Sequence, residues 1–191
     1  MNDLILIGGG GHCKSCIDVI EQEGKYNIKG ILDTPEKFGQ EVLGYKIIGS
    51  DEDISKYAQN HSFLITIGHI KTPDLRIKLY NKIKENNGKL ATIISPRAYV
   101  SKHATIQEGT IVLHDALVNA GAKIGTNCII NTKALIEHDC TIENNCHIAI
   151  GAKLAGEVTV KQNSFIGANS LIVQQRTISE NSFIKAQSLI K

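Results

Sequence analysis

The chain has 191 residues, of which 42% are hydrophobic, and 21 Lys and Arg residues nearly balance 19 Asp and Glu residues. This composition indicates a soluble globular protein with one large or two small domains, without a basic run dense enough to follow a nucleic acid backbone. The apolar run over residues 4–7 is too short for a signal peptide or a membrane span, so we expect a cytoplasmic protein.

Residues 1–92 alternate strand-like and helix-like segments, which predicts a small βαβ domain. Aliphatic runs typical of strands occupy residues 4–7, 28–32 and 63–67. Apolar periodicity predicts helices over residues 15–23 and 72–85. In the second of these, Leu75, Leu79 and Ile83 recur at every fourth position, and Pro73 stands at a permitted N-terminal position.

A turn of four glycines, residues 8–11, separates the first strand from the first helix. Cys13 stands where the last glycine of G-x-G-x-x-G would be, which disfavours a nicotinamide cofactor. A shorter anion cradle is better supported, because free backbone N–H groups and a helix N-terminus favour a phosphate.

The five cysteines include one C-x-x-C pair, Cys13 and Cys16. Such a pair is compatible with a redox centre or with half of a zinc site, but no second C-x-x-C occurs. We therefore expect a structural role for both residues. A disulfide scaffold is not expected in a reducing compartment.

From residue 94 onward an aliphatic residue recurs at every sixth position. All seventeen positions of this series, from Ile94 to Ile190, hold Ile, Val or Leu. Four positions after each of them, fourteen of sixteen residues are Ala, Ser, Thr or Cys, and the exceptions are Val158 and Arg176. One position earlier still, ten of sixteen are Gly, Asn or Asp, which adopt a positive φ at least cost.

This period predicts a chain that turns a corner every six residues, with the aliphatic side chain inside and the small residue beside it. Three flat faces close a triangular coil of eighteen residues, and stacked coils pair as parallel strands. We assign residues 93–191 to this second domain. Cys128 and Cys146 are eighteen residues apart at the small position, so we expect them to stack as interior thiols.

The six-residue repeat resembles the left-handed β-helix of the hexapeptide-repeat acyltransferases. More specifically, the run Ile136-Glu-His-Asp-Cys140 and the later His147-Ile-Ala-Ile-Gly-Ala-Lys153 and Ala155-Gly156 resemble bacterial nucleotide-sugar N-acetyltransferases of the bacillosamine and perosamine pathways, and the related sialic acid O-acetyltransferases. The glycine turn that ends in His12 adds to the likeness, which spans nearly the whole chain. It implies an α/β fold class: a Rossmann-like βαβ domain, then a left-handed parallel β-helix, assembled as a trimer.

His138 lies two positions after the inward Ile136, so we expect it at a corner with its side chain outward. Such a histidine is ordinarily a surface residue, but the resemblance implies a general base that deprotonates the attacking sugar amine or hydroxyl. An imidazole with a pKa of about 6.5 suits that task. The resemblance names Asp139 as the acid that assists it, although Asp139 also occupies the turn position of the repeat. Glu137 is a weaker candidate.

The resemblance also implies a homotrimer that binds acetyl-CoA in the grooves between neighbouring β-helices, at His147, Ala155 and Gly156. The N–H of Gly156 would donate to the thioester carbonyl. His147 lies nine residues after His138, half of one coil, so a site that used both would lie between subunits. The alternatives are a surface histidine and a plain turn glycine.

By the same resemblance the N-terminal domain binds the sugar nucleotide, with its pyrophosphate on the glycine turn. The residues implied are Gly9, Gly10, Gly11, His12, Asp33 and Gly68. Asp33 would reach the base or the ribose. Relatives often show two acids where this chain has Asp33-Thr34, which leaves the base open.

The predicted function is acetyl-CoA-dependent N-acetylation of a nucleotide-linked amino-deoxy sugar, with a 4-amino sugar favoured, for surface glycan or glycoprotein biosynthesis. The nearest alternative is O-acetylation of sialic acid or a related nonulosonic acid. A metal enzyme of the β-helical carbonic anhydrase type needs two histidines five residues apart, a spacing absent among the seven histidines, so no metal is expected. A non-catalytic sugar-nucleotide-binding module is the last alternative.

Overall fold

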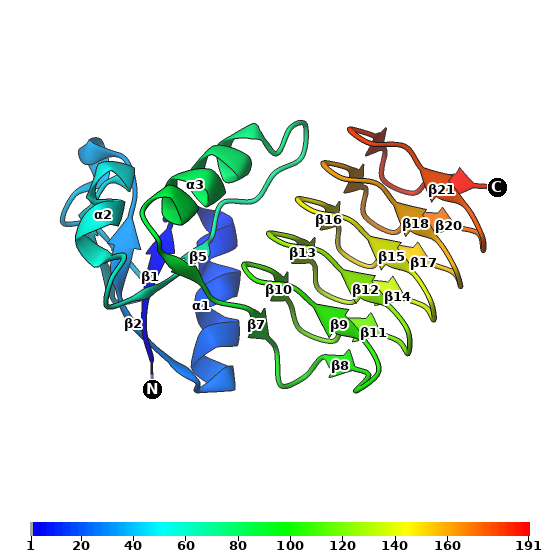
Figure 1. Ribbon diagram of the computed structural model, residues 1–191, viewed down its shortest axis with the longest axis horizontal. Coiled ribbons are helices and arrows are strands. Elements are labelled where there is room, and N and C mark those ends of the chain that lie inside the picture. The colour runs from blue at the N-terminus through cyan, green and yellow to red at the C-terminus, as the bar shows by residue number, and fades with distance from the viewer. Residues whose placement is uncertain (1) are drawn as a thin grey trace.

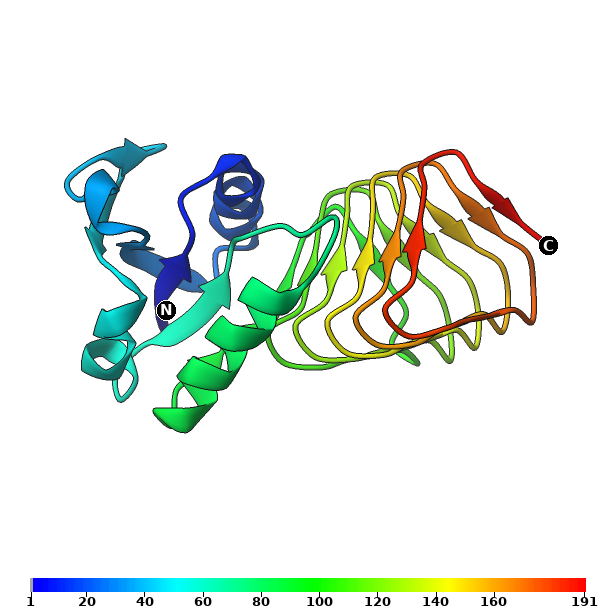
Figure 2. The same ribbon diagram turned by 90° about the horizontal axis from the view of Figure 1, so that it is seen from above.

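The computed structural model describes residues 2–191, which form a sheet-and-helix region followed by a stack of short strands (Figure 1). The chain has the expected fold class, an α/β N-terminal domain followed by a left-handed parallel β-helix. Figure 2 shows that the coils stack away from the N-terminal domain, so that the last coil lies farthest from it. No helix in residues 2–191 has the length and hydropathy that a membrane crossing requires.

The N-terminal sheet has the strand order β3-β4-β2-β1-β5-β6, and only the β3–β4 pair is antiparallel. Its strands are β1 (Asn2–Ile7), β2 (Tyr26–Leu32), β3 (Glu41–Val42), β4 (Tyr45–Gly49), β5 (Ser62–Ile65) and β6 (Lys89–Leu90). Because β2 and β5 flank β1 on opposite sides, the strand order reverses at β1. The carboxyl ends of the strands at such a reversal form the crevice where open α/β sheets bind ligands.

Two long helices cover the two faces of this sheet. The helical elements are α1 (Gly11–Glu23), η1 (Pro35–Lys37), η2 (Asp51–Asp53), α2 (Ile54–Tyr57) and α3 (Asp74–Glu85). Along β1, Leu4 and Leu6 belong to the core that contains α1, whereas Ile5 and Ile7 pack with Leu79 of α3. Successive side chains of a strand point to opposite faces, so this single strand supplies both cores.

The N-terminal domain is larger than the expected βαβ unit, because β3, β4, β6 and α2 were not predicted. These elements are two to five residues long, too short to show a period in the sequence. Helix α1 begins at Gly11 rather than Ser15, and Gly10 is its N-cap. Strand β5 ends at Ile65 rather than at residue 67.

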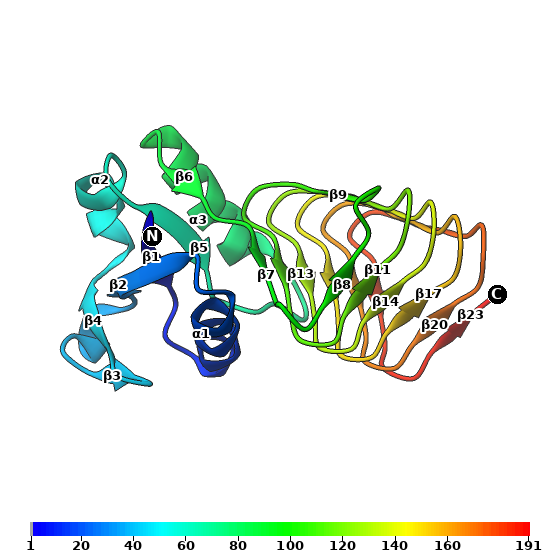
Figure 3. The same ribbon diagram turned by 90° about the horizontal axis from the view of Figure 1, so that it is seen from below.

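The β-helix consists of seventeen two-residue strands in three parallel sheets, which form the three faces of the coil (Figure 3). The first face contains β7 (Ile93–Ile94), β10 (Ile111–Val112), β13 (Ile129–Ile130), β16 (His147–Ile148), β19 (Phe165–Ile166) and β22 (Phe183–Ile184). The second contains β8 (Tyr99–Val100), β11 (Leu117–Val118), β14 (Leu135–Ile136), β17 (Lys153–Leu154), β20 (Leu171–Ile172) and β23 (Leu189–Ile190). The third contains β9 (Thr105–Ile106), β12 (Lys123–Ile124), β15 (Thr141–Ile142), β18 (Thr159–Val160) and β21 (Thr177–Ile178).

The repeat predicted from the sequence determines the interior of these coils. The aliphatic residues at every sixth position from Val112 to Ile178 are buried in one cluster, and those of the terminal coils are partly buried. The backbone φ is positive at every sixth position from Gly109 to Gln187. This includes Lys133, so the coil imposes the left-handed conformation even where the side chain disfavours it.

The N-terminal domain packs on the first face of the β-helix. The outward residues Ile93, Ile111 and Ile129 of this face are fully buried in the cluster that contains Cys13 and Cys16 of α1. These two thiols are free, and burial raises the pKa of Cys13 to about 11 and that of Cys16 still further. A thiol held neutral in a core is a poor nucleophile, in agreement with the expected structural role.

Arg76 of α3 ties the two regions together. Its side chain is 1% exposed, and Nη1 donates to the carbonyls of Ile65 (2.8 Å) and Ile67 (2.6 Å). Nη2 donates to the carbonyl (3.1 Å) and to Oδ1 (2.7 Å) of Asn127 in the β-helix. Burial lowers the pKa of Arg76 to about 10, so the guanidinium remains charged at neutral pH. No ion pair with Arg76 occurs within residues 2–191, and oxygen dipoles offset its charge.

Candidate active site

His138 lies at the corner where the chain leaves β14 of the second face and enters β15 of the third. Its side chain is 55% exposed, as its position after the inward Ile136 predicts. Nδ1 of His138 lies 3.0 Å from Oδ2 of Asp139. Because a carboxylate oxygen only accepts, Nδ1 carries the proton and Nε2 keeps a free lone pair. The neutral ring is therefore set to accept a proton at Nε2.

Asp139 acts on His138 and also shapes the turn. Its hydrogen bond, and then its charge, raise the pKa of His138 above the ordinary value. Its φ of 59° is the left-handed conformation that the turn position predicts. Gly121 of the preceding coil makes room for the carboxylate, because a Cβ there would collide with Oδ1 of Asp139.

Glu137, the weaker candidate, points away from the ring. Its Oε2 accepts from Nδ2 of Asn119 (2.7 Å) and from the backbone N–H of His138 (3.2 Å). The carboxylate thus braces the corner, and only Asp139 bonds the imidazole.

Gly156 lies beside His138 in the next coil. A Cβ on Gly156 would lie 2.6 Å from both Cε1 and Nε2 of the ring, so only glycine leaves the imidazole its place. The N–H of Gly156 has no acceptor within residues 2–191. By contrast, Ala155 donates to the carbonyl of Ile172 at 3.0 Å and accepts from Sγ of Cys140 at 3.1 Å. A free backbone donor therefore lies next to the proton-accepting nitrogen.

His147 is placed differently from the groove position that the resemblance implies. It is 7% exposed, and its Nδ1 donates to the carbonyl of His69 at 2.7 Å. Its Nε2 accepts from Nδ2 of Asn131 at 3.0 Å, so both ring nitrogens are used within the chain. The ring lies edge-on to His69 and to Phe165. The sequence shows that His147 faces outward, but not that the N-terminal domain covers it.

Three histidines meet where the N-terminal domain joins the β-helix, and we call His12, His69 and His147 the junction histidines. Burial is the largest cause that lowers the pKa of His12 to about 4, of His69 to about 3 and of His147 to about 4, and the charge of Arg76 adds to it. Nε2 of His12 and both ring nitrogens of His69 are buried without a hydrogen-bond partner among residues 2–191. The structure brings the predicted His12 and Gly68 together, because a Cβ on Gly68 would lie 3.7 Å from the His12 ring.

The glycine turn is held by Asp33 at the end of β2. Oδ2 of Asp33 accepts from the N–H of Gly9 (2.7 Å) and from Nζ of Lys37 (2.9 Å), and Oδ1 accepts from the N–H of Thr34 (2.7 Å). Burial would raise the pKa of Asp33, but these bonds lower it overall. Most of the acceptor capacity of Asp33 is therefore used inside the protein, which leaves little for the base or ribose predicted from the sequence.

Two adjoining cavities lie at the carboxyl ends of the strands. The first, about 270 Å³, is lined by Gly8, Gly10, Gly11, His12, Asp33, Lys37, Thr66, Ile67 and Gly68, and we call it the glycine cavity. A Cβ on Gly10 or Gly11 would meet no atom within 4 Å, and no acidic residue occupies the first turn of α1. Together with Lys37, the free end of α1 gives this cavity the character of an anion site.

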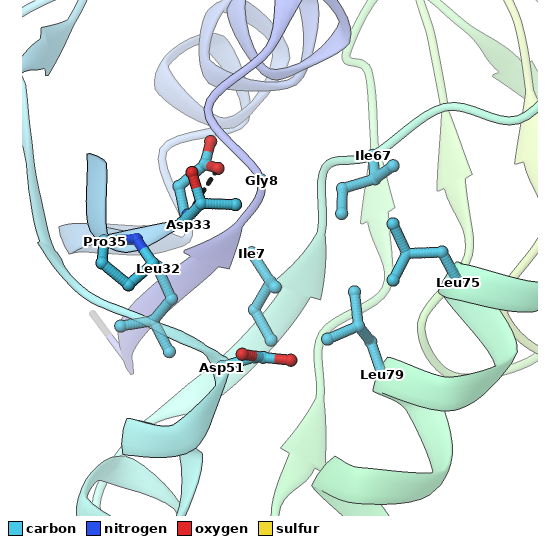
Figure 4. Close-up of a pocket in the computed structure, with 10 residues that line it drawn as sticks. Ile7, Gly8, Leu32, Asp33, Pro35, Asp51, Ile67, Leu75 and Leu79 are labelled. Carbon is cyan, nitrogen blue, oxygen red and sulfur yellow. Dashed lines mark hydrogen bonds between the residues drawn. The ribbon is translucent and has the colours of Figure 1, made fainter. Parts of the chain in front are cut away.

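The second cavity, about 160 Å³, is mostly apolar, and we call it the apolar cavity (Figure 4). It is lined by Ile7, Gly8, Leu32, Asp33, Thr34, Pro35, Asp51, Ile67, Leu75 and Leu79. Figure 4 shows Leu32 and Pro35 on one side and Ile67, Leu75 and Leu79 on the other. Leu75 is 51% exposed and forms part of this wall. Gly8, Asp33 and Ile67 line both cavities, so they form one cleft.

His138 and this cleft do not meet within one chain. The N-terminal domain packs on the first face of the coil, whereas His138 lies at the edge between the second and third faces, opposite the first. A site that uses both therefore requires two chains.

Sequence reasoning missed Lys37, Asp51, His69 and Arg76. The sequence could have indicated Lys37, because it follows Asp33 by four residues and can pair with it. The other three residues approach the site only in the folded chain. Cys128 and Cys146 are buried as predicted, and like Cys140 they donate to backbone carbonyls of the interior. No group of three His, Cys, Asp or Glu residues suited to a metal ion occurs among the described residues.

Comparison with known proteins shows which families and structures this chain resembles. Residues 3–83 match the PglD N-terminal domain, and residues 139–174 match the bacterial transferase hexapeptide (six repeats). A histidine-to-alanine mutant of GDP-perosamine N-acetyltransferase from Caulobacter crescentus, in complex with CoA and GDP-perosamine, is 29% identical with a TM-score of 0.92. That alignment covers 100% of this chain and 89% of the other.

The acetyltransferase domain of PglB from Neisseria gonorrhoeae is 27% identical with a TM-score of 0.92, over 100% of this chain and 92% of that one. The structure of the same domain in complex with acetyl coenzyme A is 27% identical in sequence, with a TM-score of 0.90. That alignment covers 100% of this chain and 93% of the other. No curated protein sequence matches significantly. The two family matches, one in each domain, and the similarity over the full chain indicate an acetyltransferase that resembles the nucleotide-sugar N-acetyltransferases.

Proposed function

We propose that this protein is an acetyl-CoA-dependent N-acetyltransferase that acetylates the amino group of a nucleotide-linked amino-deoxy sugar, with a 4-amino sugar favoured. The observation that carries the proposal is the lone pair at Nε2 of His138 beside the free N–H of Gly156. Similar structures contain CoA with GDP-perosamine, or acetyl coenzyme A, which supports this pair of substrates. Surface glycan or glycoprotein synthesis would use such a product.

The proposed reaction is a direct transfer. The amine nitrogen of the sugar attacks the thioester carbonyl carbon, and Nε2 of His138 takes the proton that the nitrogen loses. The N–H of Gly156 donates to the oxyanion that forms, and Asp139 stabilises the imidazolium. The C–S bond then breaks, and the departing sulfur takes the proton from His138. Cys140, the nearest thiol in sequence, points into the coil and is not a nucleophile in this scheme.

The active form we propose is a homotrimer, with the sugar nucleotide in the cleft of one chain and His138 supplied by another. Two features support it: the separation of the two sites within a chain, and an apolar row on the second face. Five of the six outward residues of that face are apolar, and the sixth is the exposed Lys153. Among the apolar ones, Tyr99, Leu171 and Leu189 are 60%, 40% and 52% exposed. Burying such a row is favourable and is typical of an interface. In the groove between neighbouring β-helices, Ala155 and Gly156 would lie against acetyl-CoA. The buried His147 is not part of the acetyl-CoA site that we propose.

Substitution of His138 by Ala tests the central step. We expect kcat to fall by roughly 10² to 10⁴, the usual contribution of a positioned general base. The assay follows thiol release from acetyl-CoA with UDP-, GDP- and dTDP-linked 4-amino sugars, and with sialic acid as the competing acceptor. A variant with a rate within about threefold of wild type would remove His138 from the mechanism, and faster turnover of sialic acid would replace the proposed substrate.

A further inference from the structure

The apolar cavity is lined by the polar residues Asp33, Thr34 and Asp51, and the carboxylate of Asp51 has no role in the proposed reaction. Asp51 begins η2, is separated from the end of β4 by one residue, and is partly exposed. Figure 4 shows the carboxylate at one end of the cavity, below Ile7 and beside Leu79. Within residues 2–191 no hydrogen bond or ion pair engages it, whereas its neighbours Glu52 and Asp53 are paired with Lys82 and with the N–H of Ser50.

The walls of this cavity suit a flat, apolar ring. Leu32 and Pro35 lie on one side and Leu75 and Ile67 on the other, so a ring between them would have both faces covered. The cavity adjoins the glycine cavity, where backbone N–H groups and Lys37 favour a phosphate. A nucleoside diphosphate fits this arrangement, with the diphosphate at the glycine turn and the base between the apolar walls.

We propose that Asp51 recognises the base and makes the cleft selective for a guanine nucleotide. This inference rests on the proposed nucleotide-linked substrate and adds the identity of its base. An ionised carboxylate is an acceptor only, so it requires a base edge that presents donors. Guanine alone presents two adjacent donors, the ring N1–H and the exocyclic N2 amino group, which match the two oxygens of one carboxylate.

The other bases lack this edge. Adenine and cytosine place a ring acceptor beside their amino group, and uracil and thymine flank a single N3–H with carbonyl oxygens. Each would set a lone pair against Asp51, and an unpaired polar contact is costly in a desolvated site. Asp33, the other acid of the cavity, is an inferior candidate because Gly9, Lys37 and Thr34 already engage its oxygens.

Isothermal titration calorimetry of the full chain with GDP, IDP, UDP, dTDP and ADP tests the proposal. IDP differs from GDP only by the missing N2 amino group. We expect wild type to bind GDP about 10- to 100-fold more tightly than IDP, the usual value of a bidentate contact to a base edge. In the Asp51→Asn variant the gap between GDP and IDP should close to within about threefold.

The matched control is Glu52→Gln, which removes one negative charge at the next residue, whose side chain is 81% exposed and outside the cavity. It should keep the full gap between GDP and IDP. Equal binding of GDP and IDP by wild type, tighter binding of UDP or ADP, or an unchanged gap in Asp51→Asn would overturn the inference while leaving a nucleotide substrate in place. If none of the five nucleotides binds at millimolar concentration, the proposed nucleotide-linked substrate fails together with the inference.

Discussion

Histidines at the corner of the β-helix and at the junction of the two regions experience opposite environments. His138 is exposed and bonded to Asp139, which raises its pKa, whereas burial and the nearby Arg76 lower the pKa of His12, His69 and His147. Asp139 thus favours the protonated form of His138, whereas the three junction histidines stay neutral at neutral pH. The comparison teaches that burial keeps the junction histidines neutral, as suits domain packing. At the exposed corner, the hydrogen bond and charge of Asp139 instead raise the pKa of His138, as suits the base that we propose.

The strongest test of the corner is Gly156→Ala. The φ of Gly156 is not positive, so alanine suits the backbone, but its Cβ would occupy the space of the His138 ring. We expect kcat to fall about 100-fold, the effect of misplacing a catalytic group by about 1 Å. Steady-state kinetics on purified variants measure it.

A double variant shows whether the fall in kcat of Gly156→Ala is caused by displacement of His138. If Gly156→Ala works by moving His138, adding it to His138→Ala should lower the rate little further. Full additivity would mean that Gly156 contributes independently, through its N–H.

Asp139→Asn should have a smaller effect on rate and a distinct effect on pH dependence. Because the carboxylate raises the pKa of His138, its loss lowers that pKa, and the acid limb of kcat/KM should move to lower pH. The maximal rate should fall by roughly 10-fold, less than the loss of the base itself. An acid limb that stays in place in a full pH profile would contradict the assignment of Asp139 as the partner of the base.

We expect the smallest effect from substitution of a junction histidine, which should change the pH dependence of stability and not the activity. The unfolded chain protonates histidine below about pH 6.5, whereas the folded chain keeps His69 neutral to about pH 3. Stability therefore falls as the pH decreases through this window, and His69 accounts for about 2 kcal/mol of the loss between pH 6.5 and 5. In His69→Gln the fall in Tm between pH 7 and 5 should be smaller by roughly 4 to 8 °C.

The exposed His103 provides the control for this measurement, because it lies in the β-helix away from the junction histidines. His103→Gln should retain the wild-type dependence of Tm on pH. A fall in Tm that is the same in all three proteins would show that His69 takes up its proton in the folded chain as easily as in the unfolded one.

The β-helix could be predicted almost residue by residue, because a fixed period determines which side chains point inward and which residues turn. The corner placement of His138 and the left-handed backbone of Asp139 both follow from it. The period gives the outward direction of His147 but not the domain that covers it. In the N-terminal domain, Asp51 and Leu75 line one cavity only because separate strands and helices end at one edge of the sheet. No local sequence pattern predicts that these two residues lie close together.

The hydrogen bonds of Arg76 have a consequence for protein engineering. One side chain binds two carbonyls at the end of its own sheet and the main chain and side chain of Asn127 in the coil, so a single residue pair spans both modules. A chimera that joins this β-helix to a recognition domain from a relative should transplant the arginine and its asparagine together. A donor domain without the arginine would leave Asn127 a buried acceptor without its donor, and the graft would lose its alignment even where each half folds well.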